Sequence, residues 1–301
     1  MIRALLIGIL SSFFFSFTFI LNRSMHLAGG YWIWSGSLRY LFTLPLLALL
    51  VHKVYGLHRI HSLIRRQARS WLLWSTVGFG LFYAPLCYAG DYGESWLVAA
   101  SWQITIVAGV LLTPLFGKRI AFRNLIAALI ILSGVLLLQI RYLEGFQIGI
   151  LLSVLLPILI AAVSYPLGNR KMMQLCDSQV TTLERVYGMT LCSMPFWLML
   201  SVVAVGVSGL PSLDQTGQSF LTALFSGIIA TMLFFYATDS VKQDHKRLAV
   251  VESTQAGEVI FSLLGGLLLL QDPKPDTYGY AGIALIVAGI VINSILSNSD
   301  K

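Results

Sequence analysis

Ten long apolar segments determine what this chain can fold into. They lie at about residues 3–21, 31–51, 71–90, 95–116, 124–141, 147–168, 180–206, 218–239, 248–271 and 278–296. Each is long enough to cross a bilayer as a helix, which takes about 20 residues, and none has the alternating pattern of a barrel strand. Of the 301 residues, 57% are hydrophobic and 11% are charged, whereas a soluble domain has about 25% charged residues. The sequence therefore predicts an all-α integral membrane protein with ten transmembrane helices.

Lysine and arginine residues are unevenly distributed between the two sides of this predicted bundle. Arg23, Arg141 and Lys274 fall on one side, whereas most of the other basic residues fall in loops on the side of the N-terminus. Cytoplasmic loops of membrane proteins carry the excess of positive charge. We therefore expect a multi-pass protein of the cell (plasma) membrane, with both termini in the cytoplasm. The net charge of +7 then reflects topology and contact with anionic membrane lipids, and we expect no nucleic acid partner.

The sequence lacks the motifs of an ATP-driven pump or a hydrolase. No HExxH, GxSxG, Walker or GxGxxG pattern occurs where a strand-to-helix turn would support it. The three cysteines have no paired spacing, and the histidines at 52–61 belong to a basic loop. We expect no enzyme activity, no cofactor and no metal.

Short motifs recur about 150 residues apart, in the same order along the chain. The matching pairs are Asn22-Arg23 with Asn169-Arg170, Pro45 with Pro195, Ser101-Trp102-Gln103 with Ser253-Thr254-Gln255, and Gly134 with Gly289. They predict two five-helix repeats, 1–143 and 144–301, within one membrane domain. Because five is an odd number, the two repeats would have opposite orientations in the membrane. Inverted repeats place a binding site near the membrane midplane, between the halves, and favour alternating access.

The ninth segment, at 248–271, contains two glutamates. An ionisable side chain in mid-membrane costs roughly 2.5–3.5 kcal/mol on insertion scales, so it is a candidate for function. Glu258 lies about ten residues into this segment, roughly 15 Å deep. It could bind a cationic substrate, carry a proton, or form a buried ion pair with Arg39 or Arg185. Glu252 is closer to the basic end of the segment, so an interfacial position and a role in the site are both open.

Other polar or aromatic residues within the apolar segments are candidates for the same site. Arg39 either binds a substrate carboxylate or extends to the membrane interface. Gln103 and Gln255, which match in the repeat, make either helix contacts or substrate contacts. Trp102 either packs or stacks on a flat or cationic substrate. The charged pair at 184–185 is expected near the cytoplasmic interface, in a structural role.

Several of the segments carry family-like motifs. They are Leu38-Arg39-Tyr40-Leu41-Phe42 in the second, Glu258-Val259-Ile260-Phe261-Ser262-Leu263-Leu264-Gly265 in the ninth, and the glycine-containing runs at 131–135 and 286–290 in the fifth and tenth. With ten helices in two inverted fives, the chain resembles the drug/metabolite transporter superfamily, specifically its EamA-type members and their multidrug resistance efflux branch. That family usually has proline where Val259 stands, and Leu-Gly-Glu where the ninth segment here ends in Leu270-Gln271-Asp272. The resemblance implies export of drugs, metabolites or amino acids without ATP, driven by ion gradients or exchange.

Together these observations predict a secondary active transporter that exports small organic solutes by alternating access. The residues expected to bind the substrate or couple protons are Glu258, Gln103, Trp102, Gln255, Arg39 and Glu252. Coupling to H+ through Glu258 is a further hypothesis, and both a monomer and a homodimer fit the sequence. The alternative is a non-transporting membrane receptor or assembly partner on a transporter-like scaffold, although the short loops leave little room for an interaction module.

Overall fold

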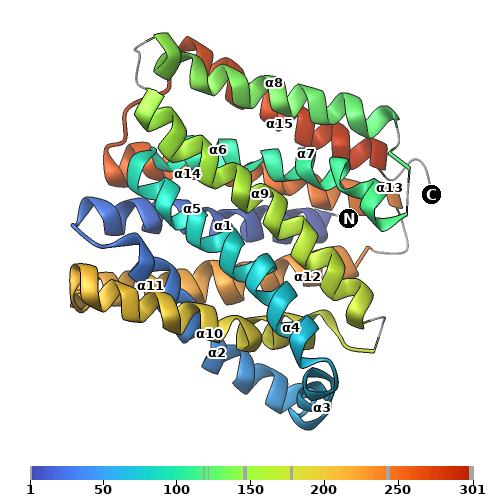
Figure 1. The fold of residues 1–301 in the computed structure, drawn as a ribbon. Coiled ribbons are helices and arrows are strands. Elements are labelled where there is room, and N and C mark those ends of the chain that lie inside the picture. The colour runs from blue at the N-terminus through green and yellow to red at the C-terminus, as the bar shows by residue number, and fades with distance from the viewer. Residues whose placement is uncertain are drawn as a thin grey trace.

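A computed structural model describes residues 2–117, 119–120, 122–144, 148–176, 179–241 and 245–297 of the chain. Within these ranges all regular secondary structure is helical and no strand occurs (Figure 1). Three of the basic residues that the charge pattern assigns to the cytoplasmic side, Lys118, Lys242 and Lys301, lie outside the described residues.

Eight helical stretches in the described part of the chain are long and apolar enough to cross a membrane. They are Ile2–Leu27, Trp32–Val54, Ala68–Tyr92, Leu151–Cys176, Thr182–Ser208, Leu213–Asp239, Val250–Leu270 and Thr277–Ile295. Two shorter apolar helices, Ser95–Leu111 and Asn124–Ile140, occupy the places of the fourth and fifth predicted segments. The helical membrane protein expected from the sequence is confirmed, whereas ten spans in two repeats stay a prediction.

Several of these stretches contain more than one helical element. The α-helices are α1 (Ile2–Leu27), α2 (Trp32–Val54), α3 (His58–Arg66), α4 (Ala68–Ser75), α5 (Leu81–Tyr92), α6 (Ser95–Trp102), α7 (Ile104–Leu111), α8 (Phe122–Glu144), α9 (Ile148–Cys176), α10 (Thr182–Ser208), α11 (Leu213–Thr222), α12 (Thr231–Asp239), α13 (His245–Glu252), α14 (Gly257–Gly265) and α15 (Thr277–Ser297). Between or beside them lie three π-helical turns, η1 (Thr76–Gly80), η3 (Ala223–Ala230) and η5 (Gly266–Leu270), and two 3-10 turns, η2 (Thr113–Phe116) and η4 (Ser253–Ala256).

Helix α1 lies at the centre of the bundle. It contacts α2, α5, α6, α11, α12, α13 and α14, whereas α8 and α15 pair at one edge and α2 and α3 lie at the other (Figure 1). We call the end of the bundle where α1 begins the N-terminal end, and the end where α1 finishes the opposite end. Small residues on α1 and α14 allow the two helices to approach closely: a Cβ added to Gly257 would lie 2.5 Å from Ser12 Oγ, and one added to Gly265 would lie 2.2 Å from Ile20 Cδ1.

The pair formed by α8 and α15 depends on glycines from the fifth and tenth predicted segments. A Cβ on Gly134 would lie 2.7 Å from the carbonyl oxygen of Gly282, and one on Gly289 would lie 2.6 Å from Ile131 Cγ1. Backbone approach of this kind is what small residues provide at helix crossings in membranes. The two glycines that match in the sequence therefore serve a helix contact within the chain.

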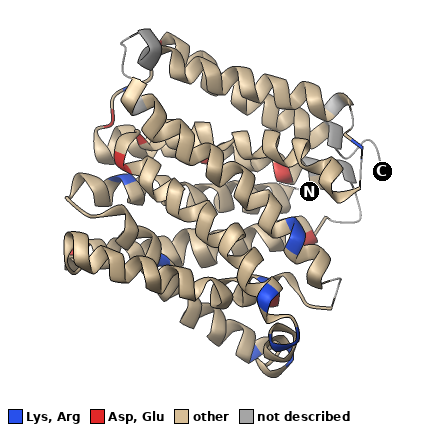
Figure 2. Cartoon of the chain, in the orientation of Figure 1, with Lys and Arg blue, Asp and Glu red and all other residues tan. Residues whose placement is uncertain are grey.

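Lys and Arg gather at the N-terminal end, around α3 and the start of α10, whereas acidic residues are prominent at the opposite end (Figure 2). Helix α3 contributes several of these basic residues and buries Ile60 against the bundle. This distribution follows the loop pattern from which we expect a cytoplasmic N-terminal end.

Candidate functional site

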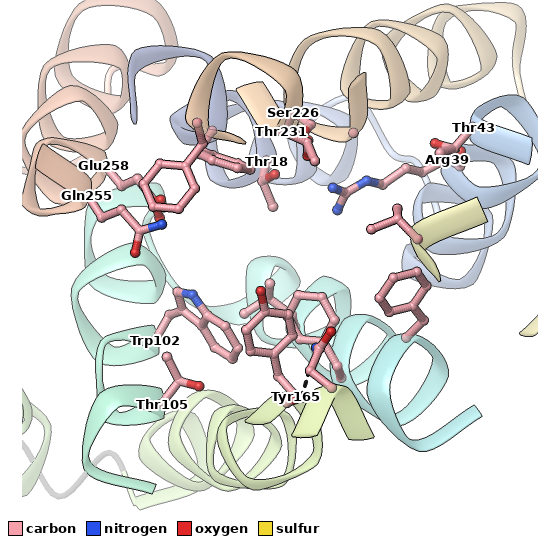
Figure 3. Close-up of a pocket in the computed structure, with 18 of the residues that line it drawn as sticks. Thr18, Arg39, Thr43, Trp102, Thr105, Tyr165, Ser226, Thr231, Gln255 and Glu258 are labelled. Atoms are coloured by element: carbon pink, nitrogen blue, oxygen red, sulfur yellow. Dashed lines mark hydrogen bonds between the residues drawn. The ribbon is translucent and has the colours of Figure 1, made fainter. Parts of the chain in front are cut away.

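A cavity of about 420 Å³ lies inside the bundle (Figure 3). Its wall is built by residues of α1, α2, α5, α6, α7, α9, α10, α12 and α14, of the turns η1, η3 and η4, and by Gln103 between α6 and α7. Sites for small molecules typically measure about 300–1,000 Å³. The cavity therefore has the size of a site for a small organic solute.

Five of the six residues expected at the site line this cavity. Glu258 and Gln255 lie together on one wall, Arg39 extends into the cavity from the opposite wall, and Trp102 lies on a third side (Figure 3). Gln103, beside Trp102, also contributes to the lining. The sixth, Glu252, is half-buried at the end of α13 and does not belong to the lining. The structure thus brings five of the predicted residues together, while their role in binding stays a prediction.

The two segments that share the Ser-x-Gln motif both interrupt a helix at the cavity. Helix α6 ends at Trp102. At Gln103 the backbone hydrogen bonds join residues three apart instead of four: Gln103 N donates to Ala100 O (3.1 Å) and Ile106 N donates to Gln103 O (3.0 Å). On the other side of the cavity, the 3-10 turn η4 separates α13 from α14 and contains Gln255. Interrupted helices near the middle of the bundle are a common way to build transporter sites, because they free backbone polar groups.

Two other walls of the cavity contain π-helical turns. Phe79 projects from η1, and Ser226 and Gly227 project from η3. A π turn inserts an extra residue into a helix and is frequent at functional sites. Four of the helical stretches that line the cavity are therefore irregular: they are interrupted at η1, at Gln103, at η3 and at η4.

The charged groups of the cavity do not pair with one another. Within the described residues, Glu258 makes no hydrogen bond and no ion pair with Arg39 or Arg185, so the buried ion pair that the sequence left open is absent. The Arg39 guanidinium lies 4.0 Å from the centroid of the Tyr83 ring, and its Nη1 is buried without a hydrogen-bond partner. Tyr83 is fully buried, so Arg39 extends inward rather than to the membrane interface.

Aromatic side chains form the wall beside Trp102. Ring centroids are 5.0 Å apart for Phe82 and Trp102, 4.8 Å for Phe82 and Tyr165, and 5.7 Å for Trp102 and Tyr165. These distances lie in the range where aromatic pairs attract each other. The result is a rigid surface on which a flat or apolar part of a solute can pack.

Arg185 and Tyr165 are among the lining residues that sequence reasoning did not place in the substrate site. The charged pair at 184–185 divides between two roles. Glu184 caps its own helix, since its Oε2 accepts from Thr181 N (2.8 Å) and Thr181 Oγ1 (3.0 Å), in the structural role that was expected. Arg185, one residue and about 100° further around α10, instead faces the cavity. The capping pattern Thr-x-x-Glu was the available signal, because it shows where α10 begins and which face Arg185 occupies.

Comparison with known proteins gives the chain its family. The family model "EmrE: Putative multidrug resistance efflux transporter" matches residues 2–299. The chain belongs to this family. The EmrE-like family is part of the drug/metabolite transporter superfamily, so the resemblance seen in the sequence is confirmed over nearly the whole chain.

Two curated bacterial proteins are also similar to this EmrE-family chain. "Uncharacterized protein YjlA" of Bacillus subtilis (strain 168) is 46% identical over 312 residues, which cover 99% of this chain and 96% of that protein. An "Uncharacterized 42.1 kDa protein in intracellular alkaline protease 3'region" of Shouchella clausii is 45% identical over 266 residues, covering 85% of this chain and 70% of that protein. Neither name specifies a substrate, so these two proteins do not indicate which solute the cavity binds.

A largely buried polar cluster lies at the opposite end of this EmrE-family protein. Asp272, whose side chain is 2% exposed, accepts hydrogen bonds from Ser95 N (2.9 Å) and Ser95 Oγ (2.7 Å), and its Oδ1 lies 3.6 Å from Arg23 Nε. Arg23 Nη1 also donates to the carbonyl oxygen of Asp91, and Asp91 Oδ1 lies 3.3 Å from His26 Nδ1. The cluster ties α1, α5 and α6 to the segment after η5.

Replacing Asp272 with alanine is expected to lower the free energy of unfolding by about 2 kcal/mol. The substitution removes two hydrogen bonds to a charged acceptor and leaves a buried N–H and a guanidinium without their partner. Thermal unfolding in detergent would measure the change, and Asp214→Ala, at an exposed position of α11, is the matched control. Equal stability of the two variants would contradict the prediction.

Proposed function

We propose that this protein is a secondary active transporter that exports small organic solutes across the plasma membrane by alternating access. The observation that carries the proposal is the cavity inside the bundle, because residues from both proposed halves line it: Arg39 and Trp102 from the first, Arg185 and Glu258 from the second. A site between two halves can be exposed to each side in turn when the halves move against each other. Membership of an efflux family supports the same function.

The two ends of the bundle differ in a way that supports alternating access. The lining includes Met173 near the end of α9 and Arg185 in the first turn of α10, so the cavity extends toward the N-terminal end. The opposite end is closed by the cluster around Asp272 and by Gln215, whose Nε2 donates to Tyr31 O (2.8 Å) and Ser35 Oγ (3.0 Å). With both termini in the cytoplasm, as the charge pattern favours, this arrangement is the inward-facing state of the cycle.

Ten helices in two inverted repeats, 1–143 and 144–301, remain our proposal for the architecture. The interrupted segments at Gln103 and Gln255, which match in the sequence, support it, as do the π turns η1 and η3 on two other cavity walls. The glycine contacts between α8 and α15 join the proposed last helices of the two halves. The π turns and the helix interruptions thus fall in corresponding segments of the two proposed halves: the third and eighth segments contain π turns, and the fourth and ninth are interrupted at the matching glutamines.

We further propose that a proton gradient drives export and that Glu258 carries the proton. Glu258 is buried, with 9% of the residue exposed, lines the cavity and has no fixed counter-charge among the described residues. An acid in this position can exchange its proton with whichever side the cavity faces. Intramembrane carboxyl groups act as proton relays in this way in many pumps and transporters.

Solute flux in proteoliposomes tests the proposed function. Purified protein is reconstituted, and uptake of labelled amino acids, aromatic carboxylates, amines and lipophilic cations is measured with and without an imposed pH gradient. We expect flux of at least one of these classes above that of protein-free liposomes, increased by the gradient. Binding of a solute without flux of any class would overturn transport and favour a receptor on a transporter-like scaffold.

A further inference from the structure

We propose that the substrate of this cavity carries an anionic group, such as a carboxylate, that Arg39 binds, and a cationic group that Glu258 binds. The solute class is therefore a zwitterion with an apolar or aromatic body. This inference rests on the proposed function, since it names the class of solute that the proposed transporter would carry.

The first argument is the balance of charge in the lining. The described lining contains two arginines, Arg39 and Arg185, which carry positive charge. It contains one acidic residue, Glu258. A guanidinium stays protonated in proteins. Neither arginine forms an ion pair within the described chain, so the lining has an excess of positive charge even when Glu258 is ionised. Buried charge of this kind is costly unless a partner compensates it, and an anionic group on the ligand would supply that partner.

The second argument is the hydrogen-bonding state of Arg39. Its guanidinium lies against the rings of Tyr83 and Tyr40, at 4.0 and 5.9 Å from their centroids, and its Nη1 is buried without a hydrogen-bond partner. The tyrosine rings hold the planar group in place and leave donor capacity unused. Arginine binds carboxylates through two parallel N–H bonds, so this pre-positioned group suits an oxyanion.

The third argument is the separation of the opposite charges. Figure 3 shows Glu258 and Gln255 on one wall and Arg39 on the facing wall, with open space between them. Ser226 and Thr231 on the intervening wall are uncharged, and their hydroxyl groups donate to backbone carbonyl oxygens rather than to Glu258. A zwitterion that spans this space would place its carboxylate at Arg39 and its ammonium group at Glu258.

The wall between the charged ends suits an apolar body. Phe82, Trp102 and Tyr165 form a continuous aromatic surface there, with the centroid distances given above. A lipophilic cation would also pack on this surface, but it would add positive charge beside two unpaired guanidiniums. The charge balance therefore favours a zwitterion over a cation.

A matched set of ligands tests this inference directly. Binding of 4-(aminomethyl)benzoate, 4-methylbenzoate, 4-methylbenzylamine and tetraphenylphosphonium to the detergent-purified full chain is measured by titration calorimetry. The first three share one ring and differ in whether they carry both charged groups at opposite ends of the ring, the carboxylate alone or the amine alone. We expect 4-(aminomethyl)benzoate to bind on the order of tenfold more tightly than either single-charge analogue, and tetraphenylphosphonium to bind most weakly.

Substitutions then assign each charged group to its partner. Arg39→Gln is expected to weaken binding of 4-(aminomethyl)benzoate and 4-methylbenzoate on the order of tenfold and to leave binding of 4-methylbenzylamine unchanged or tighter, and Arg39→Lys should restore part of the loss. Arg69→Gln, at an exposed position of α4, is the matched control and should keep the wild-type order. If Arg39→Gln does not fold, the order of the four ligands on the wild-type protein still decides.

Tighter binding of 4-methylbenzylamine or tetraphenylphosphonium than of 4-(aminomethyl)benzoate would overturn the inference, as would absence of binding by all four. The proposed function fails by a different result. Transport of a lipophilic cation without binding of the zwitterion would support the proposed transport function and reject a zwitterionic substrate. Binding of the zwitterion without flux would support the proposed ligand class and reject the transport function.

Discussion

Replacing Glu258 with glutamine is expected to abolish the acceleration of transport by a pH gradient and to reduce gradient-driven flux on the order of tenfold or more. Glutamine has nearly the same shape but cannot release a proton or balance a cationic group. Because Glu258 makes no hydrogen bond or ion pair with the described residues, the substitution breaks no contact of this kind, so the protein should fold. Flux into proteoliposomes, measured with and without the gradient, provides the test.

Two comparisons make this test specific. Asp214→Asn, on the exposed surface of α11, removes a carboxylate away from the cavity and should transport like the wild type. Transport by Glu258→Gln with undiminished pH dependence would reject proton coupling through this residue. A variant that still responds to pH but loses affinity for amine-bearing solutes would instead assign Glu258 to substrate binding alone.

Gly168→Val is expected to prevent stable folding, with a loss of about 3 kcal/mol or more in the free energy of unfolding. A Cβ at this position of α9 would lie 2.3 Å from Gly78 Cα and 2.5 Å from Gly78 N. Those atoms belong to the backbone of the π turn η1, which cannot move aside as a flexible side chain would. Any accommodation must separate α9 from η1, and both of these elements contribute residues to the cavity wall.

Thermal unfolding and the monodispersity of the purified protein measure this effect. The matched control is Gly206→Val in α10, where an added Cβ would meet nothing within 4 Å. This control should unfold near the wild-type temperature. A Gly168→Val protein as stable as the control would show that the contact between α9 and η1 is not tight in the membrane.

The lengths of the apolar segments in the sequence could predict most of the helices. Where a helix differs in length from its apolar segment, the cause is local. The fourth predicted segment, 95–116, is one apolar run in the sequence, but its helix ends at Leu111 and is followed by η2, which contains Pro114. Proline lacks the N–H that a continuing helix needs, and Gly117 then adopts a positive φ of 72°. The regular helix is therefore shorter than the apolar run.

The candidate site could be predicted where a residue contrasts with its apolar surroundings. Glu258 and Arg39 stand out in this way, because an ionisable group within a membrane span requires a special environment. Phe82 and Tyr165 do not, since an aromatic side chain suits lipid, a neighbouring helix or a cavity equally well. In a membrane the outside of the bundle is as apolar as its core, so the sequence pattern does not show which face is turned inward.

The buried cluster around Asp272 has a kinetic consequence for the proposed cycle. Opening the opposite end requires the Arg23–Asp272 contact and the two Ser95 hydrogen bonds to break together. Each 1.4 kcal/mol by which these contacts favour the closed state lowers the population of the open state about tenfold. A solute that binds both states equally would not change this ratio. Turnover would therefore be set by how strongly the bound solute favours release of this cluster, and a protein with a weakened cluster would exchange solute faster while retaining it less well.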